Sequence, residues 1–172
     1  MRIVAGELRG RRISAPAGNS TRPTTEMARE AIFNALNSMG VVDGARVLDL
    51  FAGSGALGIE ALSRGAAHCT FIESDREALR ILQENLKNLG LTDRATVVRG
   101  DAKAGLVKYH EIDFVLADPP YDFTDWKQIL DQVSADLVVA ESDREIVAIE
   151  GWQSLRTKRY GRTHVTYLRR VP

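Results

Sequence analysis

Apolar residues recur along the chain at two alternating spacings, one typical of helices and the other of buried strands. Helical spacing predicts helices over residues 25–39, 56–64, 75–89 and 125–140. Short apolar runs between them predict strands over residues 45–51, 68–73, 95–99, 113–117 and 144–150. Strands that alternate with helices in this way form a parallel sheet that is covered on both faces.

Two of the helices carry more detailed signals. The apolar face of the first helix runs from Met27 to Met39, and we expect this face to pack against the sheet. Ser74 and Glu77 have the spacing of a capping box, so we expect Ser74 to cap the helix over residues 75–89.

The two ends of the chain lack this alternation. Residues 2–5 and 11–14 are short apolar and basic runs separated by glycines, which predicts a small hairpin, and the Pro-containing residues 15–24 predict a loop. Residues 158–160 and 163–168 are β-rich runs around a glycine, which predicts an antiparallel hairpin at one edge of the sheet.

With 172 residues, the chain is long enough for one domain with a sizeable core. We predict an α/β fold over residues 25–172, a doubly wound, mostly parallel seven-stranded Rossmann-like sheet with an antiparallel C-terminal hairpin. A basic N-terminal arm or hairpin over residues 1–24 precedes it.

Composition excludes several protein classes. The chain is 44% apolar and 27% charged, which is typical of globular proteins. No apolar run approaches the ~18 residues of a membrane span, and the first residues lack a signal-peptide core. One cysteine, Cys69, and three scattered histidines provide neither a disulfide framework nor a metal-ligand spacing. We expect a cytoplasmic, monomeric enzyme or binding domain with no membrane partner and no metal.

The formal net charge of zero conceals a segregation of charge. Residues 1–25 carry a net +4, residues 151–172 a net +6, and the body between them −10. Two basic ends around an acidic body either are solvated or bind an anionic partner, and the charges alone leave both open.

A glycine-rich segment follows the strand over residues 45–51. Gly53, Gly55 and Gly58 fit the spacing G-x-G-x-x-G, in which the first glycine permits a tight turn and the second lets a ligand approach. The third lets the helix pack closely on the strand. Glu73 lies 20 residues after Gly53 at the end of the next strand, where a carboxylate binds a ribose diol. The segment therefore predicts nucleoside binding.

Two further acids help to identify the nucleoside. Asp49, four residues before Gly53, would repel a pyrophosphate and attract an ammonium such as that of S-adenosylmethionine. Asp101 follows the third strand and could accept a hydrogen bond from an adenine amino group. Acids at three successive strand ends favour S-adenosylmethionine over NAD.

The strand over residues 113–117 runs directly into Asp118-Pro119-Pro120-Tyr121. The Asp118 carboxylate and the Pro119 carbonyl are two acceptors that match an exocyclic NH₂ with two donors. Holding both hydrogens withdraws the nitrogen lone pair from ring conjugation and directs it at a methyl carbon. Tyr121 offers a face on which a planar base can stack. Trp126 and Phe123 either border this pocket or pack in the core.

These motifs resemble a known family. Asp49-x-Phe51-x-Gly53-x-Gly55 with Asp118-Pro119-Pro120-Tyr121 resembles class I S-adenosylmethionine-dependent amino-methyltransferases. Four other segments resemble the RsmD-type 16S ribosomal RNA guanine-N2 methyltransferases: residues 2–11, 21–24, 29–34 and 158–163. The resemblance covers essentially the whole chain. It implies methyl transfer to N2 of one guanine in small-subunit ribosomal RNA, in the bacterial cytoplasm.

We therefore make three residue assignments. The residues predicted to bind S-adenosylmethionine are Asp49, Phe51, Gly53, Gly55, Glu73, Asp101 and Asp118. The residues predicted to act on the target amine are Asp118, Pro119 and Tyr121. The residues predicted to contact ribosomal RNA, free or in the small ribosomal subunit, are Arg9, Arg11, Arg12 and Arg22, with Arg159 and Arg162 as further candidates.

Other functions remain open on the sequence. Adenine N6 of DNA and a protein amide also present an NH₂ to an acceptor such as Asp118. The G-x-G-x-x-G spacing alone also fits an NAD-binding oxidoreductase. The basic ends alone would also fit an RNA-binding protein without catalysis.

Overall fold

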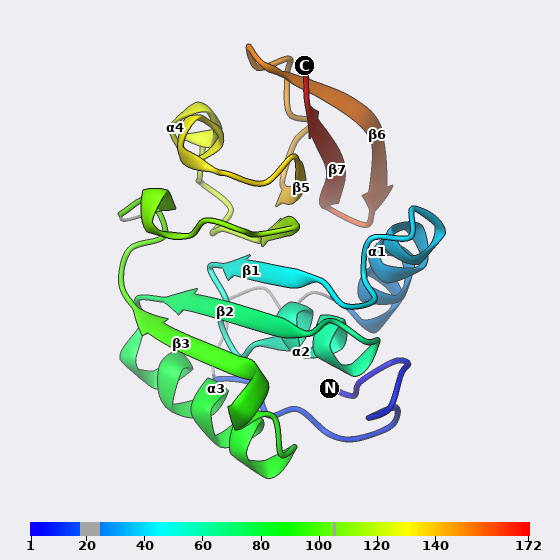
Figure 1. The fold of residues 1–172 in the computed structure, drawn as a ribbon, viewed down its shortest axis with the longest axis vertical. Helices are drawn as coiled ribbons and strands as arrows, with labels where there is room; N and C mark the ends of the chain where they lie inside the picture. Colours follow the sequence, from blue (N-terminus) through cyan, green and yellow to red (C-terminus); the bar gives the residue numbers. More distant parts are fainter. Residues whose placement is uncertain (18–24, 105) are drawn as a thin grey trace.

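A seven-stranded sheet forms the centre of the fold in a computed structural model that describes residues 1–17, 25–104 and 106–172 (Figure 1). The strand order is β3-β2-β1-β4-β5-β7-β6. The strands are β1 (Arg46–Leu50), β2 (His68–Glu73), β3 (Ala95–Arg99), β4 (Phe114–Ala117), β5 (Leu137–Ser142), β6 (Trp152–Tyr160) and β7 (Thr163–Arg170). β1 to β5 pair in parallel, whereas β7 runs antiparallel to both of its neighbours. This arrangement confirms the predicted fold class.

Within the described residues, four α-helices cover the sheet. They are α1 (Glu26–Ser38), α2 (Ala56–Ser63), α3 (Arg76–Asn88) and α4 (Trp126–Gln132), with 3₁₀ turns η1 (Thr92–Arg94) and η2 (Leu106–Lys108). Alternate strand residues point to opposite faces, so Val47 packs with α1, α2 and α3 while Leu48 packs with α4. None of the described helices is long and apolar enough to cross a membrane.

The N-terminal arm, residues 1–17, packs on the domain as part of its core. An antiparallel bridge joins Arg2 to Arg12, and the Ile3 N–H donates to the Arg11 carbonyl at 2.9 Å. Ile3 and Ile13 are each only 2% exposed and belong to the same apolar cluster as α2 and α3. The predicted hairpin is therefore anchored by buried side chains.

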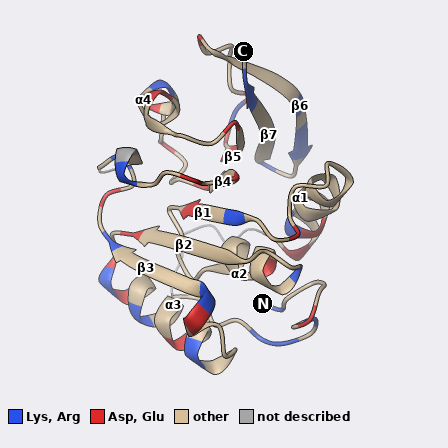
Figure 2. Cartoon of the chain, viewed as in Figure 1, with Lys and Arg blue, Asp and Glu red and all other residues tan. Residues whose placement is uncertain are grey.

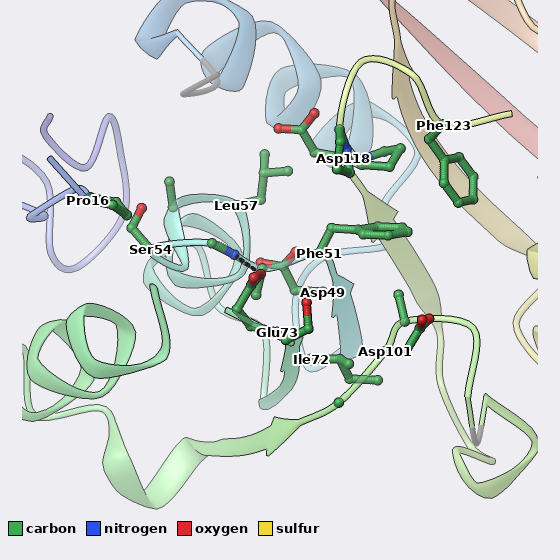
Figure 3. A pocket seen from close by; sticks show the side chains of 18 of the residues that line it. Pro16, Asp49, Phe51, Ser54, Leu57, Ile72, Glu73, Asp101, Asp118 and Phe123 are labelled. Carbon is green, nitrogen blue, oxygen red and sulfur yellow. Dashed lines mark hydrogen bonds between the residues drawn. The ribbon is translucent and has the colours of Figure 1, made fainter. Parts of the chain in front are cut away.

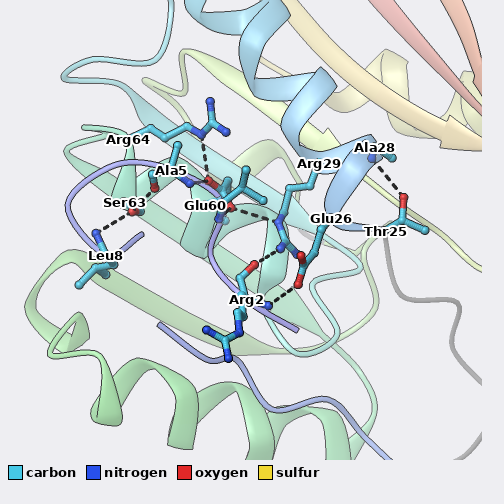
Figure 4. Close-up of polar contacts among 12 residues, drawn as sticks. Arg2, Ala5, Leu8, Thr25, Glu26, Ala28, Arg29, Glu60, Ser63 and Arg64 are labelled. Atoms are coloured by element: carbon cyan, nitrogen blue, oxygen red, sulfur yellow. Dashed lines mark hydrogen bonds and ion pairs between the residues drawn. The ribbon is translucent and has the colours of Figure 1, made fainter. Parts of the chain in front are cut away.

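A buried carboxylate on α2 holds the arm in place (Figure 4). Glu60 is fully buried and accepts hydrogen bonds from the backbone N–H groups of Val4 and Ala5 at 2.9 and 3.0 Å. The same carboxylate pairs with Arg29 at 3.1 Å and with Arg64 at 2.9 Å. Arg29, also fully buried, donates in turn to the Arg2 carbonyl. Burial lowers the pKa of Arg29, and the Glu60 charge opposes this shift.

Ser63 provides a second attachment of the arm to α2. Its hydroxyl donates to the Ala5 carbonyl at 2.6 Å and accepts from the Leu8 N–H at 3.0 Å. Its carbonyl accepts from the Glu7 N–H at 2.8 Å. All eight residues of α2 are buried, because the arm and α1 cover the sides of this helix that the sheet does not cover.

The segment after β4 departs from the prediction. The expected helix over residues 125–140 ends at Gln132, and its last residues belong instead to β5. The expected strand over residues 144–150 is absent from this described segment, where only an isolated bridge joins Ile149 to Trp152. β6 begins at Trp152, six residues before its predicted start. A short apolar run fits a buried strand as well as a buried helix, which accounts for the error.

Two predicted details of the helices, the cap of α3 and the buried face of α1, were also wrong. Asp75, not Ser74, caps α3, and its side chain accepts from the Ala78 N–H at 2.9 Å. Met27 is 65% exposed, so the buried face of α1 does not begin there. That face includes Arg29 and Phe33, which the apolar spacing left out.

Candidate cofactor and substrate site

A cavity of about 400 Å³ lies at the carboxyl ends of β1, β2, β3 and β4 (Figure 3). Its lining includes all four acids predicted to act there: Asp49, Glu73, Asp101 and Asp118. Phe51, Gly53, Pro119 and Tyr121 also line it. Parallel strands bring their carboxyl ends to one edge of the sheet, which is why Asp49 and Asp118, 69 positions apart in the sequence, line the same cavity.

Asp49 is the most deeply placed of the four acids. It is 1% exposed, and its carboxylate accepts a hydrogen bond from the Gly58 N–H at 2.9 Å. Burial raises the pKa of Asp49 well above its usual range, and the nearby charges of Asp118 and Glu73 raise it further. The Gly58 hydrogen bond opposes the shift. A ligand cation beside Asp49 would relieve the cost of this buried negative charge.

Glu73 ends β2 and bridges two turns. One carboxylate oxygen accepts from the Gly53 N–H at 2.9 Å and the other accepts from the Asp75 N–H at 3.1 Å. Backbone amides at the start of a Rossmann helix are the groups that bind a pyrophosphate in dinucleotide enzymes. Here Glu73 and Asp49 accept from the amides of Gly53 and Gly58, and both carboxylates would repel a phosphate.

The three glycines of the loop serve different purposes. Gly53 adopts φ +58° and faces open space, as a turn beside a ligand requires. At Gly55, with φ +90°, a Cβ would lie 2.4 Å from Leu82 Cδ1, and Gly55 is not among the residues that line the cavity. Gly55 therefore permits close packing of the loop against α3, and its predicted place beside a ligand stays a prediction. At Gly58 a Cβ would lie 2.4 Å from Phe71 Cε1, so this glycine permits close packing of α2 on β2.

Asp101 lies at the exposed rim of the cavity. Its carboxylate accepts from the Lys103 N–H at 2.7 Å, which fixes the turn after β3. The Lys103 ammonium pairs with Asp125 at 2.9 Å and so joins this turn to the start of α4. The one basic side chain that lines the cavity, among the described residues, therefore has an acidic partner.

The Asp118–Tyr121 segment forms the opposite wall. Ala117 pairs with Leu50, so Asp118 emerges beside the turn at Phe51. Phe51 has φ +59°, a left-handed conformation that is strained for an aromatic residue. Its ring meets Phe123 edge-on at 5.2 Å. Tyr121 is 45% exposed at the cavity.

The structure also places the two aromatic residues that the sequence left open. Phe123 lines the cavity, and its N–H donates to the Pro120 carbonyl at 3.0 Å. Trp126 is 7% exposed and meets Phe123 edge-on at 5.1 Å, as a packing residue behind the cavity wall.

Basic residues gather on the arm and on the β6–β7 hairpin (Figure 2). Arg9, Arg11 and Arg12 are exposed, and Arg11 donates to the Asn88 carbonyl at 3.0 Å. Ser142 pairs with His164, so the hairpin turn that carries Arg162 lies at the carboxyl end of β5. Arg22 lies outside the described residues.

Sequence reasoning missed several buried polar residues that shape this region. They are Arg29, Glu60, Ser63 and Asn85, together with Glu141 near the end of β5. In the sequence, each of these residues shows only as a polar residue within an otherwise apolar helix face or strand. That pattern does not distinguish a buried polar residue from one that faces solvent.

Comparison with known proteins identifies close relatives. The family model described as "Conserved hypothetical protein 95" matches residues 1–169. The chain is 42% identical to YlbH of Bacillus subtilis over 96% of both chains. It is 32% identical to Ribosomal RNA small subunit methyltransferase D of Haemophilus influenzae, over 94% of this chain and 89% of that protein. The solved structure of yhhF from Escherichia coli superposes with a TM-score of 0.85 at 36% identity, covering 99% of this chain and 97% of that one.

Proposed function

Because the chain belongs to the family of ribosomal RNA small subunit methyltransferase D, we propose that it transfers a methyl group from S-adenosylmethionine to a guanine N2 amine of 16S ribosomal RNA. One observation carries the proposal beyond the family relationship. A single cavity combines acids from successive strand ends with the Asp118-Pro119-Pro120-Tyr121 segment. The first group suits a cationic nucleoside, and the second suits an exocyclic amine on a planar base.

The cofactor end of the cavity would be formed by Asp49, Glu73 and Asp101. Glu73, at the end of β2, would accept from the ribose hydroxyls, and Asp101 at the rim would accept from the adenine amino group. Because burial raises the pKa of Asp49, a cationic ligand, which stabilises the ionised carboxylate, is favoured beside it over a phosphate. These residues therefore fit S-adenosylmethionine better than NAD, whose pyrophosphate would meet the Asp49 and Glu73 carboxylates. S-adenosylmethionine, when bound, supplies an electrophilic methyl group on a sulfonium.

The substrate end would be formed by the segment after β4. Asp118 and the Pro119 carbonyl would accept both hydrogens of the guanine N2 amine, which localises the nitrogen lone pair. Tyr121, exposed at the cavity, would stack on the base after it leaves its helix or loop. The rate would come mainly from positioning and electrostatics, because methyl transfer needs little proton chemistry before the step.

The RNA would be held outside the cavity. Arg9, Arg11 and Arg12 lie on the arm whose later residues, Ala15 and Pro16, line the cavity. Phosphate contacts there would fix the register of the RNA, while the cavity selects the base. Arg22 remains an RNA contact proposed from the sequence alone. Arg162 would extend the RNA contact along the same edge of the sheet.

The proposal is tested by separating cofactor binding from transfer. Calorimetry should detect binding of S-adenosylmethionine and no binding of NAD. The Asp118→Ala variant should lose labelled methyl transfer to unmodified small subunits by at least ~100-fold, as for loss of a preorganised polar group, and this loss should far exceed any loss of S-adenosylhomocysteine affinity. Tight NAD binding without binding of the methyl donor would refute the proposal. Full transfer activity in Asp118→Ala would refute the assignment of Asp118.

A further inference from the structure

The N-terminal arm contributes to the cavity itself. Met1, Ala15 and Pro16 line the cavity together with Ser54 of the glycine loop. Figure 3 shows Pro16 beside Ser54, on the side of the cavity away from Asp118. The proposed cofactor end of the site thus has a wall that comes from the arm, although the arm is remote from the loop in sequence.

One side chain joins this wall to the glycine loop. Asn85 of α3 is 3% exposed, and its amide nitrogen donates to the Ser14 carbonyl at 2.9 Å and to the Ser54 carbonyl at 3.0 Å. Its amide oxygen accepts from the Ser14 N–H at 2.9 Å. A primary amide has both donors and an acceptor, so it can satisfy all three backbone groups at once.

We propose that Asn85 is a positioning residue that holds the arm against the glycine loop and thereby sets the shape of the cofactor site. The inference rests on the proposed function, because it takes the cofactor to be S-adenosylmethionine. Asn85 would not touch the cofactor. It would act through Ser14, which precedes the lining residues Ala15 and Pro16, and through Ser54, which lines the cavity directly.

The same arrangement links the two binding events. The arm that Asn85 fixes also carries Arg9, Arg11 and Arg12, the arginines proposed to hold RNA. RNA bound to these arginines would press the anchored arm against the glycine loop and so against the cofactor wall, and each ligand would then tighten the other by the same factor. Without the Asn85 bridge, this coupling would be lost.

Asn85→Asp is the sharpest test, because it keeps the shape of the side chain and the acceptor for Ser14. It replaces the donor by an oxygen that faces two carbonyls. Asn88→Asp is the matched control: it makes the same chemical change three residues later on the same helix, at an exposed position. We expect Asn85→Asp to weaken S-adenosylhomocysteine binding about tenfold, which is the size of one lost hydrogen bond. We expect Asn88→Asp to stay within about twofold of the wild type.

Kinetics and RNA separate positioning from simple destabilisation. At a temperature where melting curves show both variants folded, Asn85→Asp should raise the KM for S-adenosylmethionine and leave kcat unchanged. Saturating unmodified small subunits should tighten S-adenosylhomocysteine binding in the wild type and in Asn88→Asp, and not in Asn85→Asp. If Asn85→Asp does not fold, Asn85→Ser removes the same two donors without adding charge.

Equal S-adenosylhomocysteine affinities for the Asn85 and Asn88 variants would overturn the role of Asn85. A lowered kcat with unchanged cofactor affinity would overturn it as well. A wild-type protein that binds no S-adenosylhomocysteine would refute the proposed function itself, which is a different result.

Discussion

Replacement of Glu60 by Gln should destabilise the protein far more than a typical loss of one charge. Glu60 is fully buried and accepts from four donors: the N–H groups of Val4 and Ala5 and the guanidinium groups of Arg29 and Arg64. Glutamine has nearly the same shape, but it loses the charge and turns one oxygen into a donor. Each oxygen accepts from two of these donors, so two of the four would then face another donor.

The magnitude follows from the partner that is left behind. Arg29 is fully buried, and Glu60 is the acid that pairs with it there. Removing one member of a buried ion pair costs about 3–5 kcal/mol, because the remaining charge stays desolvated. For a domain of this size, each kcal/mol corresponds to roughly 2–4 °C. We therefore expect the midpoint of thermal unfolding to fall by roughly 6–20 °C.

Urea denaturation measures this change, with Glu84→Gln as the matched control. Glu84 pairs with Arg80 at 2.9 Å but is 57% exposed, so the same substitution should cost at most about 1 kcal/mol. Trypsin provides a local readout, because the arm holds four exposed arginines, at residues 2, 9, 11 and 12, and should be cut faster once Glu60 no longer anchors it. If Glu60→Gln cost no more free energy of unfolding than Glu84→Gln, the buried carboxylate would not be what anchors the arm.

Three further predictions concern the site and its packing. Asp49→Asn should raise the stability of the unliganded protein at neutral pH and weaken S-adenosylhomocysteine binding. The folded-state pKa of Asp49 is raised, so the wild type loses stability as pH rises from the unfolded-state pKa toward the folded-state pKa. The stability advantage of Asp49→Asn should therefore shrink as pH is lowered. An advantage in urea melts that does not depend on pH would contradict this. Neutralising Arg9, Arg11 and Arg12 together should weaken RNA binding and reduce the slope of log K against log salt by up to about 3, with unchanged cofactor affinity in calorimetry. An equal fall in cofactor affinity would mean that these side chains are structural instead. Gly58→Ala should cost about 1–3 kcal/mol of unfolding free energy, because its Cβ would meet Phe71, whereas Gly100→Ala has open space and should cost less; equal costs would argue against close packing at Gly58.

Residues 45–99 follow the predicted order of strands and helices closely. The helices there have periodic apolar patterns that end close to a glycine, and the strands between them are short apolar runs. The cavity was predictable for the same reason: parallel strands place Asp49, Glu73 and Asp118 at one edge whatever the details of their connections. Local spacing therefore located the acids that line the site.

Tertiary contacts decide what local spacing could not. Residues 137–140 form a continuous apolar run, which fits a buried helix and a buried strand equally well. Pairing with β4 and β7 makes this run a strand. Glu60 and Asn85 are polar residues on helices, which usually face water, and their burial depends on the arm that covers them. The arm reaches them from about 55 and 71 residues away along the chain. No pattern within either helix encodes that contact.

The central claim is tested most directly by identifying the methylated product. Small ribosomal subunits that lack the modification, free ribosomal RNA and DNA are each incubated with the protein and labelled S-adenosylmethionine, and the digested nucleosides are separated and weighed by mass spectrometry. We expect N2-methylguanosine from small-subunit ribosomal RNA, with no label on DNA. Labelled N6-methyladenosine, or label recovered only on DNA or on protein, would contradict it.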